Sequence, residues 1–488
     1  MTTRTRDMIR MQGYLLLVMA AAMAVPCIMA WYTGETESMR AFAWVLSGCI
    51  LIGSAFILFI KPSPVRLKSK DGFLVVSVSW LIASLVGALP FMLSGSIPDF
   101  CSAFFESCSG FSTTGASILT DIESLPKSIL FWRSFTHWLG GMGILVFIMA
   151  LLPALGINGQ LVANAETPGP TKDKVASKFS EMAKDLYIIY IAFTVLETFL
   201  LCLDGLSLYD ALIHTFGTVG TGGFSNYNDS AGHFGSAYVE WIIILFMYLA
   251  GINFNLFYLA GRRGLHKLLL DEEFRFYTLL IAAVSVLIFL CRAAFGGLHA
   301  LGETFRNSVF QVVSILTTTG YMTDDYDIWP TFARFLIFLL FFIGGCSSST
   351  AGGVKCVRIL VAFRLVRRGI SLKLHPHRIA HVTLNERELS NEVVIHITNF
   401  IFTYLLILSG GFLLISLNGF DFMSSFTAAA TCLGNIGPGF GVFGPTMNFS
   451  IMSGFSKLVC SGLMLLGRLE LFTLMVLFSR YYWNPNKC

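Results

Sequence analysis

The sequence predicts an all-α polytopic membrane protein: four pseudo-symmetric helix–pore-loop–helix repeats around a central pore, preceded by two extra N-terminal transmembrane helices. The composition points to a membrane, because 55% of the 488 residues are hydrophobic and only 13% are charged, against roughly 25% charged residues in a typical soluble domain. Apolar runs recur along the chain at lengths near the ~20 residues that a helix needs to cross a bilayer. The third observation is a glycine-containing turn that recurs in four of the loops between these runs.

The apolar runs define the predicted spanning segments. They cover residues 13–33, 41–60, 74–94, 128–152, 186–203, 237–259, 276–292, 331–366 with an interruption, 393–417 and 452–480. The first run follows three arginines, as in a signal peptide, but it is long and a second run follows at once, so we expect a retained helix. Lysine and arginine cluster after every second segment, and the positive-inside rule puts these loops and both termini in the cytoplasm.

Four loops on the opposite side share one pattern: an apolar stretch too short to span, a turn with glycine, and the next long segment. The turns are Thr113-Thr114-Gly115, Thr221-Gly222-Gly223, Thr318-Thr319-Gly320 and Asn435-Ile436-Gly437. A second glycine follows inside the next segment, at Gly140, Gly251, Gly344 and Gly467. This self-similarity predicts a repeat architecture. Its expected boundaries are 1–70 for the two N-terminal helices and 71–155, 156–268, 269–370 and 371–488 for repeats 1 to 4.

The second loop raises a question of register. Its residues Thr218-Val219-Gly220-Thr221-Gly222 look like TVGYG, the filter sequence of potassium channels. Only the frame with Gly223 aligns with the other three loops, whereas the frame with Gly220 aligns with none. We therefore interpret the channel-like string as an offset coincidence beside the repeated turn.

The four turns together have the chemistry of an ion path. Re-entrant backbone leaves carbonyl groups unpaired at membrane depth, which is tolerated only where they line water or lie inside protein. A ring of such carbonyls suits a dehydrated monovalent cation, and glycine permits positive φ and a close approach to the ion. The short helices before the turns would direct the negative ends of their dipoles toward the ion. The N-caps predicted for these helices are Asp99, Asp210, Asn307 and Asp421.

The eighth segment is interrupted by small residues from Gly344 to Gly353. A continuous run of this kind cannot face lipid, so we predict an intramembrane loop in the ion path below the filter. A helix-packing face is the alternative, but packing needs a small residue only at every fourth position. The glycine, serine and threonine residues of the predicted loop are Gly344, Gly345, Ser347, Ser348, Ser349, Thr350, Gly352 and Gly353.

Arg468 lies in the middle of the last segment, where a charge costs at least a few kcal/mol unless it is paired or hydrated. Glu470 is two residues away and points to the other side of a helix, which makes it a poor partner. We expect Arg468 to lie in the pore below the filter and repel cations; a structural arginine bonded to backbone carbonyls is the alternative. Snorkelling explains Arg133, and hydrogen bonds to backbone or neighbouring helices explain Glu106.

Six segments carry a resemblance to a known family: GFSTTGAS, GTGGFSNYN, TTTGYMTDD, GNIGPGFG, GGCSSSTAGGVK and GRLELF. They resemble the Trk-type potassium uptake family, the TrkH/KtrB-like membrane subunits, over essentially the full chain. The resemblance implies potassium uptake across the cell inner membrane, with the ion bound at the four turns. It implies that a gating loop ends at Lys355 and that Arg468 limits flux. The filter glycines that it implies are Gly115, Gly223, Gly320 and Gly437.

The resemblance also implies partners: membrane lipid, a second copy in a homodimer, and a cytoplasmic TrkA-like regulatory subunit that binds a nucleotide. We expect this subunit on the basic loops at 155–185, 262–268 and 364–385, and we expect no nucleic-acid partner. No cofactor is expected in this chain, because no GxGxxG motif follows a predicted strand and no CxxC or Cys/His spacing suggests a metal.

Other functions are weighed against potassium uptake. A proton- or sodium-coupled symporter stays open and would use Glu106 or His214 as a proton site. A less selective carrier of potassium and sodium stays open because the residues after the filter glycines differ among the loops. A membrane-embedded transferase or protease is disfavoured, since no nucleophile or ligand set accompanies the acid–base residues, so we predict that the chain is not an enzyme.

Overall fold

The computed structural model describes residues 3–61, 69–143, 179–264, 266–296, 300–377 and 381–483, and these ranges are mostly helical. The long continuous helices are α1 (Thr3–Thr33), α2 (Thr36–Phe59), α3 (Ser69–Leu93), α8 (Phe179–Leu203), α13 (Glu272–Gly296) and α17 (Asn391–Ser416). Short helical elements join them, namely α12 (His266–Leu270), α21 (Arg480–Trp483), η2 (Ser230–Phe234), η3 (Tyr326–Ile328), η4 (Gly441–Phe443) and η5 (Val476–Phe478). A small antiparallel hairpin pairs β1 (Thr383–Leu384) with β2 (Arg387–Glu388).

The long helices agree with the spans that the apolar runs predict. Among the described residues, six helices are long and apolar enough to cross a membrane, and eight spans result if each of two bent helix pairs counts as one. The two N-terminal helices cross at glycines, because a Cβ at Gly13 would lie 3.0 Å from the Gly53 carbonyl oxygen and the reverse distance is 2.9 Å. Small residues allow this close approach between membrane helices.

Four short helices precede the repeated turns. They are α4 (Phe100–Phe111), α9 (Leu208–Val219), α14 (Leu301–Leu316) and α18 (Phe422–Gly434). Helices α4, α9 and α18 bury most of their residues, and α14 buries half. Asp99 caps α4 as predicted, accepting hydrogen bonds from the Ser102 N–H (2.9 Å) and hydroxyl (2.7 Å). The bond from the Ser102 hydroxyl is the main cause of the lowered pKa of Asp99. Asp421 caps α18 in the same way through Ser424.

The other two predicted N-caps are wrong. Ser207 caps α9, because its hydroxyl accepts the N–H of Asp210 at 3.1 Å and places Asp210 in the first turn. Helix α14 begins after Ala300, so Asn307 lies within the helix, where its backbone already has helical partners. Helix α9 therefore starts before Asp210, and α14 starts before Asn307.

The helix that follows each turn bends or ends within a few residues of the second glycine of its repeat. These helices are α5 (Lys127–Gly141), α10 (Ala237–Ala250), α15 (Thr331–Leu340) and α19 (Gly454–Arg468). After the break, α11 (Phe254–Arg263) turns by 87° from α10, and the stretch that starts with α20 (Phe472–Met475) turns by 110° from α19. Our expectation of continuous spans at 237–259 and 452–480 is therefore wrong. Helix α16 (Cys356–Leu374) follows the predicted interruption, and residues 144–152 lie outside the described ranges.

Packing at the second glycine of each repeat explains three of these breaks. A Cβ at Gly140 would lie 1.9 Å from the carbonyl oxygen of Phe111 at the end of α4. A Cβ at Gly467 would lie 2.1 Å from the carbonyl oxygen of Leu433 in α18. One at Gly251 would lie 2.4 Å from the Tyr277 hydroxyl of α13 and 2.9 Å from Cγ2 of Thr317, the C-cap of α14. The broken helices thus press their backbone directly on the ends of the short helices, where no side chain fits.

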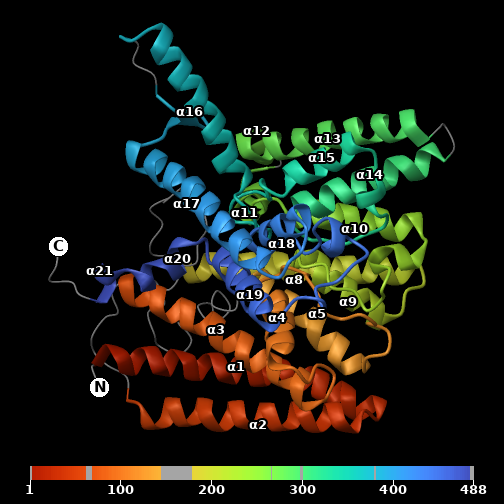
Figure 1. Cartoon of the computed structure of the whole chain (residues 1–488). Helices are drawn as coiled ribbons and strands as arrows, with labels where there is room; N and C mark the ends of the chain where they lie inside the picture. Colours follow the sequence, from red (N-terminus) through yellow and green to blue (C-terminus); the bar gives the residue numbers. More distant parts are fainter. Residues whose placement is uncertain are drawn as a thin grey trace.

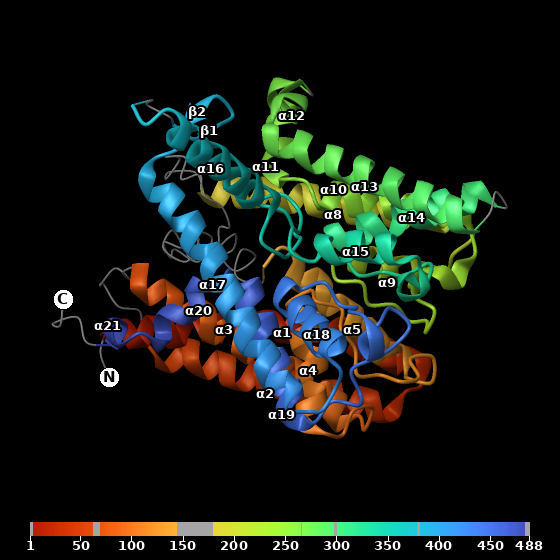
Figure 2. The ribbon, with the colours of Figure 1, turned by 45° about the horizontal axis from the view of Figure 1, so that its top comes forward.

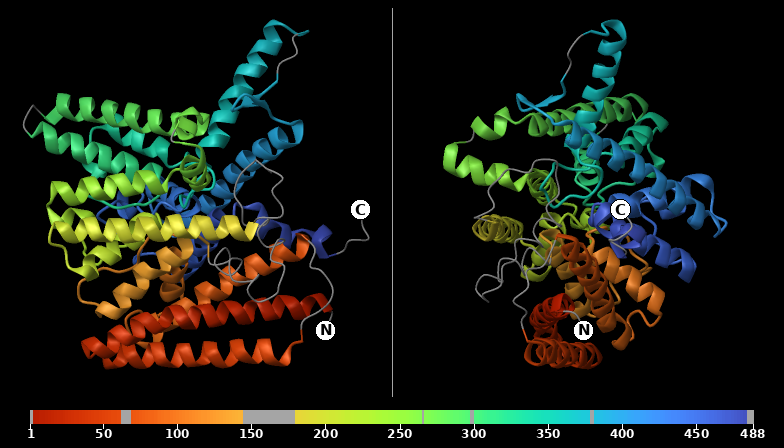
Figure 3. Two further views of the ribbon diagram at one scale, coloured as in Figure 1. Left: turned by 180° about the vertical axis from the view of Figure 1, so that it is seen from behind. Right: turned by 90° about the vertical axis from the view of Figure 1, so that its left-hand side faces the viewer.

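The short helices pack in a cyclic order. Helix α4 packs on α19, α9 on α5 and α14 on α10, while Phe426 of α18 contacts Phe338 of α15 with ring centroids 6.0 Å apart. Each short helix therefore contacts the broken helix of the preceding repeat, and the first contacts the last. Figures 1 and 2 show α1 and α2 side by side at one edge of this assembly and α13–α15 at the opposite edge, and Figure 3 shows the same layers from behind and from the side.

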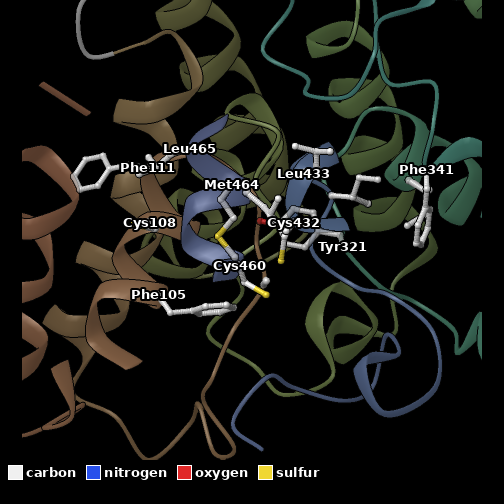
Figure 4. Packing of buried hydrophobic residues seen from close by; sticks show 14 of the residues in the cluster. Phe105, Cys108, Phe111, Tyr321, Phe341, Cys432, Leu433, Cys460, Met464 and Leu465 are labelled. Atoms are coloured by element: carbon white, nitrogen blue, oxygen red, sulfur yellow. The ribbon is translucent and has the colours of Figure 1, made fainter. Parts of the chain in front are cut away.

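The core lies among the short helices. Figure 4 shows Cys432 and Leu433 of α18 beside Cys460 and Met464 of α19, with side chains of α4 nearby. Where the structure describes them, the predicted repeat boundaries fall within helices, and that at 70/71 lies inside α3. The boundary at 268/269 falls inside α12 and that at 370/371 inside α16, while that at 155/156 lies outside the described residues.

Candidate functional site

The four turns adopt the same backbone conformation. In each turn the first and third residues have positive φ: 55° and 79° at Thr113 and Gly115, 55° and 76° at Thr221 and Gly223, 57° and 82° at Thr318 and Gly320, and 55° and 104° at Asn435 and Gly437. A threonine in this region is strained by roughly 1–3 kcal/mol, and such strain persists only where the surrounding structure imposes it, often at functional sites.

The turns meet one another in a closed ring. A Cβ at Gly115 would lie 2.0 Å from the Gly222 carbonyl oxygen, and one at Gly223 would lie 2.0 Å from the Thr319 carbonyl oxygen. The series continues in the same sense: a Cβ at Gly320 would lie 2.2 Å from the Ile436 oxygen, and one at Gly437 would lie 2.8 Å from the Thr114 oxygen. Each glycine thus leans on the carbonyl of the residue before the next glycine, and the fourth returns to the first.

The register of the second turn follows from the same geometry. Gly220 ends α9 with φ −74° and ψ −13°, an ordinary right-handed conformation. Gly223, in contrast, has the positive φ and the neighbouring carbonyl that the other three glycines have. The frame with Gly223 is therefore the one that is equivalent among the four turns. That these residues bind an ion stays a prediction.

Side chains from several repeats hold the ring together. The Asn435 amide donates to Thr114 Oγ1 (3.0 Å) and to the Met464 carbonyl (2.9 Å). The Tyr321 hydroxyl, directly after the third turn, donates to the His214 carbonyl oxygen at 2.9 Å. These contacts join repeats four and one, and three and two, so the turns are braced from behind by polar groups.

The run of small residues between α15 and α16 is not helical, in agreement with the predicted interruption. Its base is pinched: the Lys355 N–H donates to Ile343 O (2.7 Å) and the Cys356 N–H to Gly345 O (2.9 Å). Gly344 and Gly353 meet there, since a Cβ at Gly353 would lie 2.8 Å from the Gly344 Cα. Both have positive φ, 84° and 74°.

The loop lies directly against the ring. The Gly352 N–H donates to Thr318 Oγ1 at 2.6 Å, and a Cβ at Gly352 would lie 2.4 Å from the Gly434 carbonyl oxygen. The loop also bonds to the break of the second repeat, where the Cys346 N–H donates to Gly251 O at 2.9 Å and Thr350 Oγ1 donates to Ala250 O at 3.1 Å. It thus fills the space beneath the third and fourth turns.

Arg468 reaches this loop from the break of α19. Its guanidinium donates to the carbonyl oxygens of Thr350 (2.7 Å), Gly140 (2.6 Å) and Gly141 (2.6 Å). Bonds to backbone carbonyls are what the alternative of a structural arginine predicts. Two of the bonds, however, connect α19 of repeat four to the end of α5 in repeat one, and the third holds the loop. The Arg468 side chain is half-buried, and Glu470 is paired with Arg358.

Two acidic residues lie near the loop: Glu273, which is buried and was missed from the sequence, and Glu470, which is 25% exposed and was considered only as a partner for Arg468. Glu273 of α13 accepts hydrogen bonds from the Ser347 N–H and hydroxyl, both at 2.6 Å. Glu470 pairs with Arg358 of α16 at 2.5 Å, and the Lys355 ammonium donates to the Ala351 carbonyl. The sequence did contain a sign of the Glu273 contact, namely the acidic run at 271–273 just before a predicted span. A carboxylate in or beside the membrane indicates that another residue pairs with it.

The expectation that Arg133 snorkels is wrong. Its side chain is 2% exposed and pairs at 2.6 Å with the fully buried carboxylate of Glu106. The guanidinium stacks on the Phe224 ring at 3.5 Å and donates to the Ser225 carbonyl. Arg133 lies in α5 and Glu106 in α4, and the helices pack so closely that the pair satisfies itself instead of reaching the interface.

The remaining ionisable candidates are bonded locally. His214 contacts the Asp210 carbonyl through Nδ1 (2.8 Å) and the Ser225 hydroxyl through Nε2 (3.0 Å), as expected for hydrogen bonding within the fold. In the described ranges no group of three or more histidine, cysteine, aspartate or glutamate side chains could hold a metal ion.

Comparisons with known proteins fit this geometry. Residues 40–484 match the family model TrkH, described as "Cation transport protein". The chain is 37% identical to the Trk system potassium uptake protein TrkH of Escherichia coli K12, covering 98% of this chain and 99% of that protein. It is 32% identical to TrkG of the same organism, covering 99% of each. The crystal structure of the potassium transporter TrkH from Vibrio parahaemolyticus superposes with a TM-score of 0.88 at 32% identity, over 98% of this chain and 99% of that one. The chain therefore belongs to the TrkH family of cation transport proteins and is a membrane-embedded ion transporter, not an enzyme.

Proposed function

We propose that the chain is the membrane subunit of a Trk-type system that carries potassium into the cell. The observation that carries the proposal is the closed ring of four turns, in which each glycine contacts the carbonyl of the next turn. Relatives matched over nearly the whole chain are named potassium uptake proteins. Backbone carbonyls on a ring can replace the hydration shell of a monovalent cation.

The ring also has a favourable field. Each short helix ends at a turn, so the partial negative charge of its C-terminus lies beside the ion. Arg133 and Glu106 neutralise each other behind the first two turns, so no net charge from this pair disturbs the ion. Potassium is the cargo in this proposal, and its ligands are the carbonyls of the turn residues. Glycine at Gly115 favours potassium by resemblance to the family.

The loop from Gly344 to Gly353 serves as the gate in this proposal. It lies beneath the turns, it is held by a few hydrogen bonds, and its base can act as a hinge because both ends are glycines with positive φ. Arg468 both ties the loop down through Thr350 and adds a positive charge to the path. Opening would break the Arg468–Thr350 and Gly352–Thr318 bonds, at a cost that a regulatory partner can supply.

We further propose an inner-membrane protein with both termini in the cytoplasm, a homodimer, and regulation by a cytoplasmic nucleotide-binding subunit similar to TrkA. The orientation rests on the basic residues at the ends of α11 and α16, where Arg262, Arg367 and Arg368 lie. The nucleotide would be bound by the partner, and this chain contributes the conducting path. Residues 155–178 of the expected docking loops lie outside the described ranges.

The observed contacts favour a channel-like path over coupled transport through the sites considered above. Glu106 is paired with Arg133, and both ring nitrogens of His214 are engaged. Neither is therefore a free proton carrier.

The test uses the full chain in liposomes, with its regulatory partner, under a set membrane potential. We expect uptake of potassium to exceed uptake of sodium and the reversal potential to follow the potassium gradient alone. A reversal potential that shifts with the proton or sodium gradient would replace this proposal with coupled symport. Equal uptake of potassium and sodium would instead support the less selective carrier.

A further inference from the structure

Glu197 is an intramembrane carboxyl group that the ion path does not use. It lies in α8, inside the apolar span Lys184–Leu203, and its side chain is 0% exposed. Neither of its oxygens accepts a hydrogen bond from the described residues. Ionisable residues within membrane spans are costly and are kept for a function.

The neighbours of Glu197 do not supply a proton to it. Helix α8 packs on α9, and the Thr218 hydroxyl of α9 lies near the Glu197 carboxyl group without forming a hydrogen bond of normal geometry to it. The Tyr321 hydroxyl, after the third turn, lies within electrostatic range of the same carboxyl group. The Thr218 hydroxyl donates its single proton to the His214 carbonyl at 2.8 Å, and the Tyr321 hydroxyl donates to the same carbonyl at 2.9 Å. Both neighbouring hydroxyl protons are therefore already used.

No cation compensates the carboxyl group either. Glu197 takes part in none of the salt bridges formed within the described ranges, and Arg133, which also interacts with Tyr321, is bound to Glu106 and to the Ser225 carbonyl. An ionised carboxylate without a partner is strongly disfavoured away from water. A neutral carboxylic acid, in contrast, has one O–H to donate, and Thr218 Oγ1 retains a lone pair to accept it.

This contact would fix the second turn of the ring. Thr218 lies in the last turn of α9, next to Gly217, whose carbonyl oxygen accepts the N–H groups of Gly222 (2.7 Å) and Gly223 (3.4 Å). A side chain that fixes the position of Thr218 therefore also fixes the neighbouring Gly217 carbonyl, to which the second turn is hydrogen-bonded. The same residue is linked through the His214 carbonyl to Tyr321 of the third turn.

We propose that Glu197 is a protonated positioning residue, which donates its carboxyl proton to Thr218 Oγ1 and thereby sets the position of the second filter turn. The proposal rests on the proposed function of the four turns as a selectivity filter. It concerns the neutral form of the side chain, which acts on the ion only through Thr218 and the α9 backbone.

The protonation state is tested by infrared spectroscopy on the full-length protein in liposomes at neutral pH. We expect wild type minus Glu197→Gln to show the carbonyl stretch of a protonated carboxylic acid, and isotope labelling of glutamate should shift it. A difference spectrum with only carboxylate bands would overturn the proposal. This readout needs no ion transport, so it stands even if the four turns prove not to be a filter.

The positioning role is tested by the ratio of potassium to sodium uptake. Glu197→Gln keeps a neutral donor and should stay within about twofold of wild type, whereas Glu197→Leu should lower the ratio about fivefold, the factor for one net hydrogen bond. If the leucine variant does not fold, Thr218→Val removes the acceptor and Thr218→Ser keeps it, and the same contrast is expected. Loss of uptake in Glu197→Gln, which indicates a proton carrier, or equal ratios for Thr218→Val and Thr218→Ser, would refute the role.

Discussion

Gly223 and the carbonyl oxygen of Thr319 belong to consecutive turns of the ring, yet a Cβ on Gly223 would lie only 2.0 Å from that oxygen. A hydrogen atom is thus the largest substituent that the contact accepts. The φ of 76° at Gly223 adds a second reason, because side chains strain the backbone there.

Gly223→Ser should therefore displace the Thr319 carbonyl and reduce the preference for potassium over sodium. Gly205→Ser is the matched control, since Gly205 has φ 90° but nothing within 4 Å of its Cβ position. Gly220 is a poorer control than its sequence suggests, because a Cβ there would lie 2.6 Å from the Phe216 oxygen. Parallel uptake of the two ions in liposomes measures the effect. Equal losses in Gly223→Ser and Gly205→Ser would show that backbone strain alone is responsible.

Arg468→Ala should raise the flux of monovalent cations. The substitution removes a positive charge that repels the permeating ion in a low-dielectric path, and it releases the loop by removing the bond to Thr350. Arg468→Lys separates these effects, because lysine keeps the charge but lacks the planar fork that reaches several carbonyls at once. Rates of cation uptake at a fixed potential decide the matter. Misfolding of the alanine variant without faster flux would support a purely structural arginine.

Removing residues 346–351 should leave a path that conducts without the partner. The pinched base brings Gly344 and Gly353 together, so joining Gly345 to Gly352 shortens the loop while leaving α15 and α16 in place. The turns belong to other segments, so the preference for potassium should survive. Uptake is compared with and without the regulatory subunit. Slow, partner-dependent uptake by a correctly folded deletion variant would rule out the loop as a gate.

Arg133→Met should destabilise the protein by about 3–5 kcal/mol, because it leaves the buried Glu106 carboxylate without its partner. The double variant with Glu106→Gln should recover much of this loss, since two neutral side chains need no ion pair. Thermal unfolding in detergent measures both. If Arg133 only snorkelled, the single variant would unfold near the wild-type temperature and the double variant would bring no recovery.

The sequence predicts the spans and the positions of the turns well, because apolar length and recurring glycines are local signals. It fails where a partner far along the chain decides. The break after Gly251 is stabilised by the loop from Gly344 to Gly353, whose Cys346 lies almost a hundred positions later, and the break of α19 places Glu470 against Arg358. A hydropathy pattern alone predicts a continuous apolar helix at each of these two breaks.

Charged residues show the same limit. Arg133 near the end of an apolar run is compatible with snorkelling, and only the packing of α4 on α5 brings Glu106 to it. Glu197 is similar, since its isolation depends on where the hydroxyl protons of Thr218 and Tyr321 point. The local sequence shows that a charged residue lies in an apolar segment, but only the folded structure shows which residue pairs with it.

The ring of turns has a consequence for biosynthesis. Its last contact, from Asn435 to Thr114, joins residues 321 positions apart, so the first turn has no closing neighbour while the ribosome is still making the third. Until then the first turn lies in the bilayer without the contact that the fourth turn makes with its carbonyl groups. Insertion of the fourth repeat is then the step that completes the assembly, and a chain truncated before it would leave the ring of turns open between the first and third repeats.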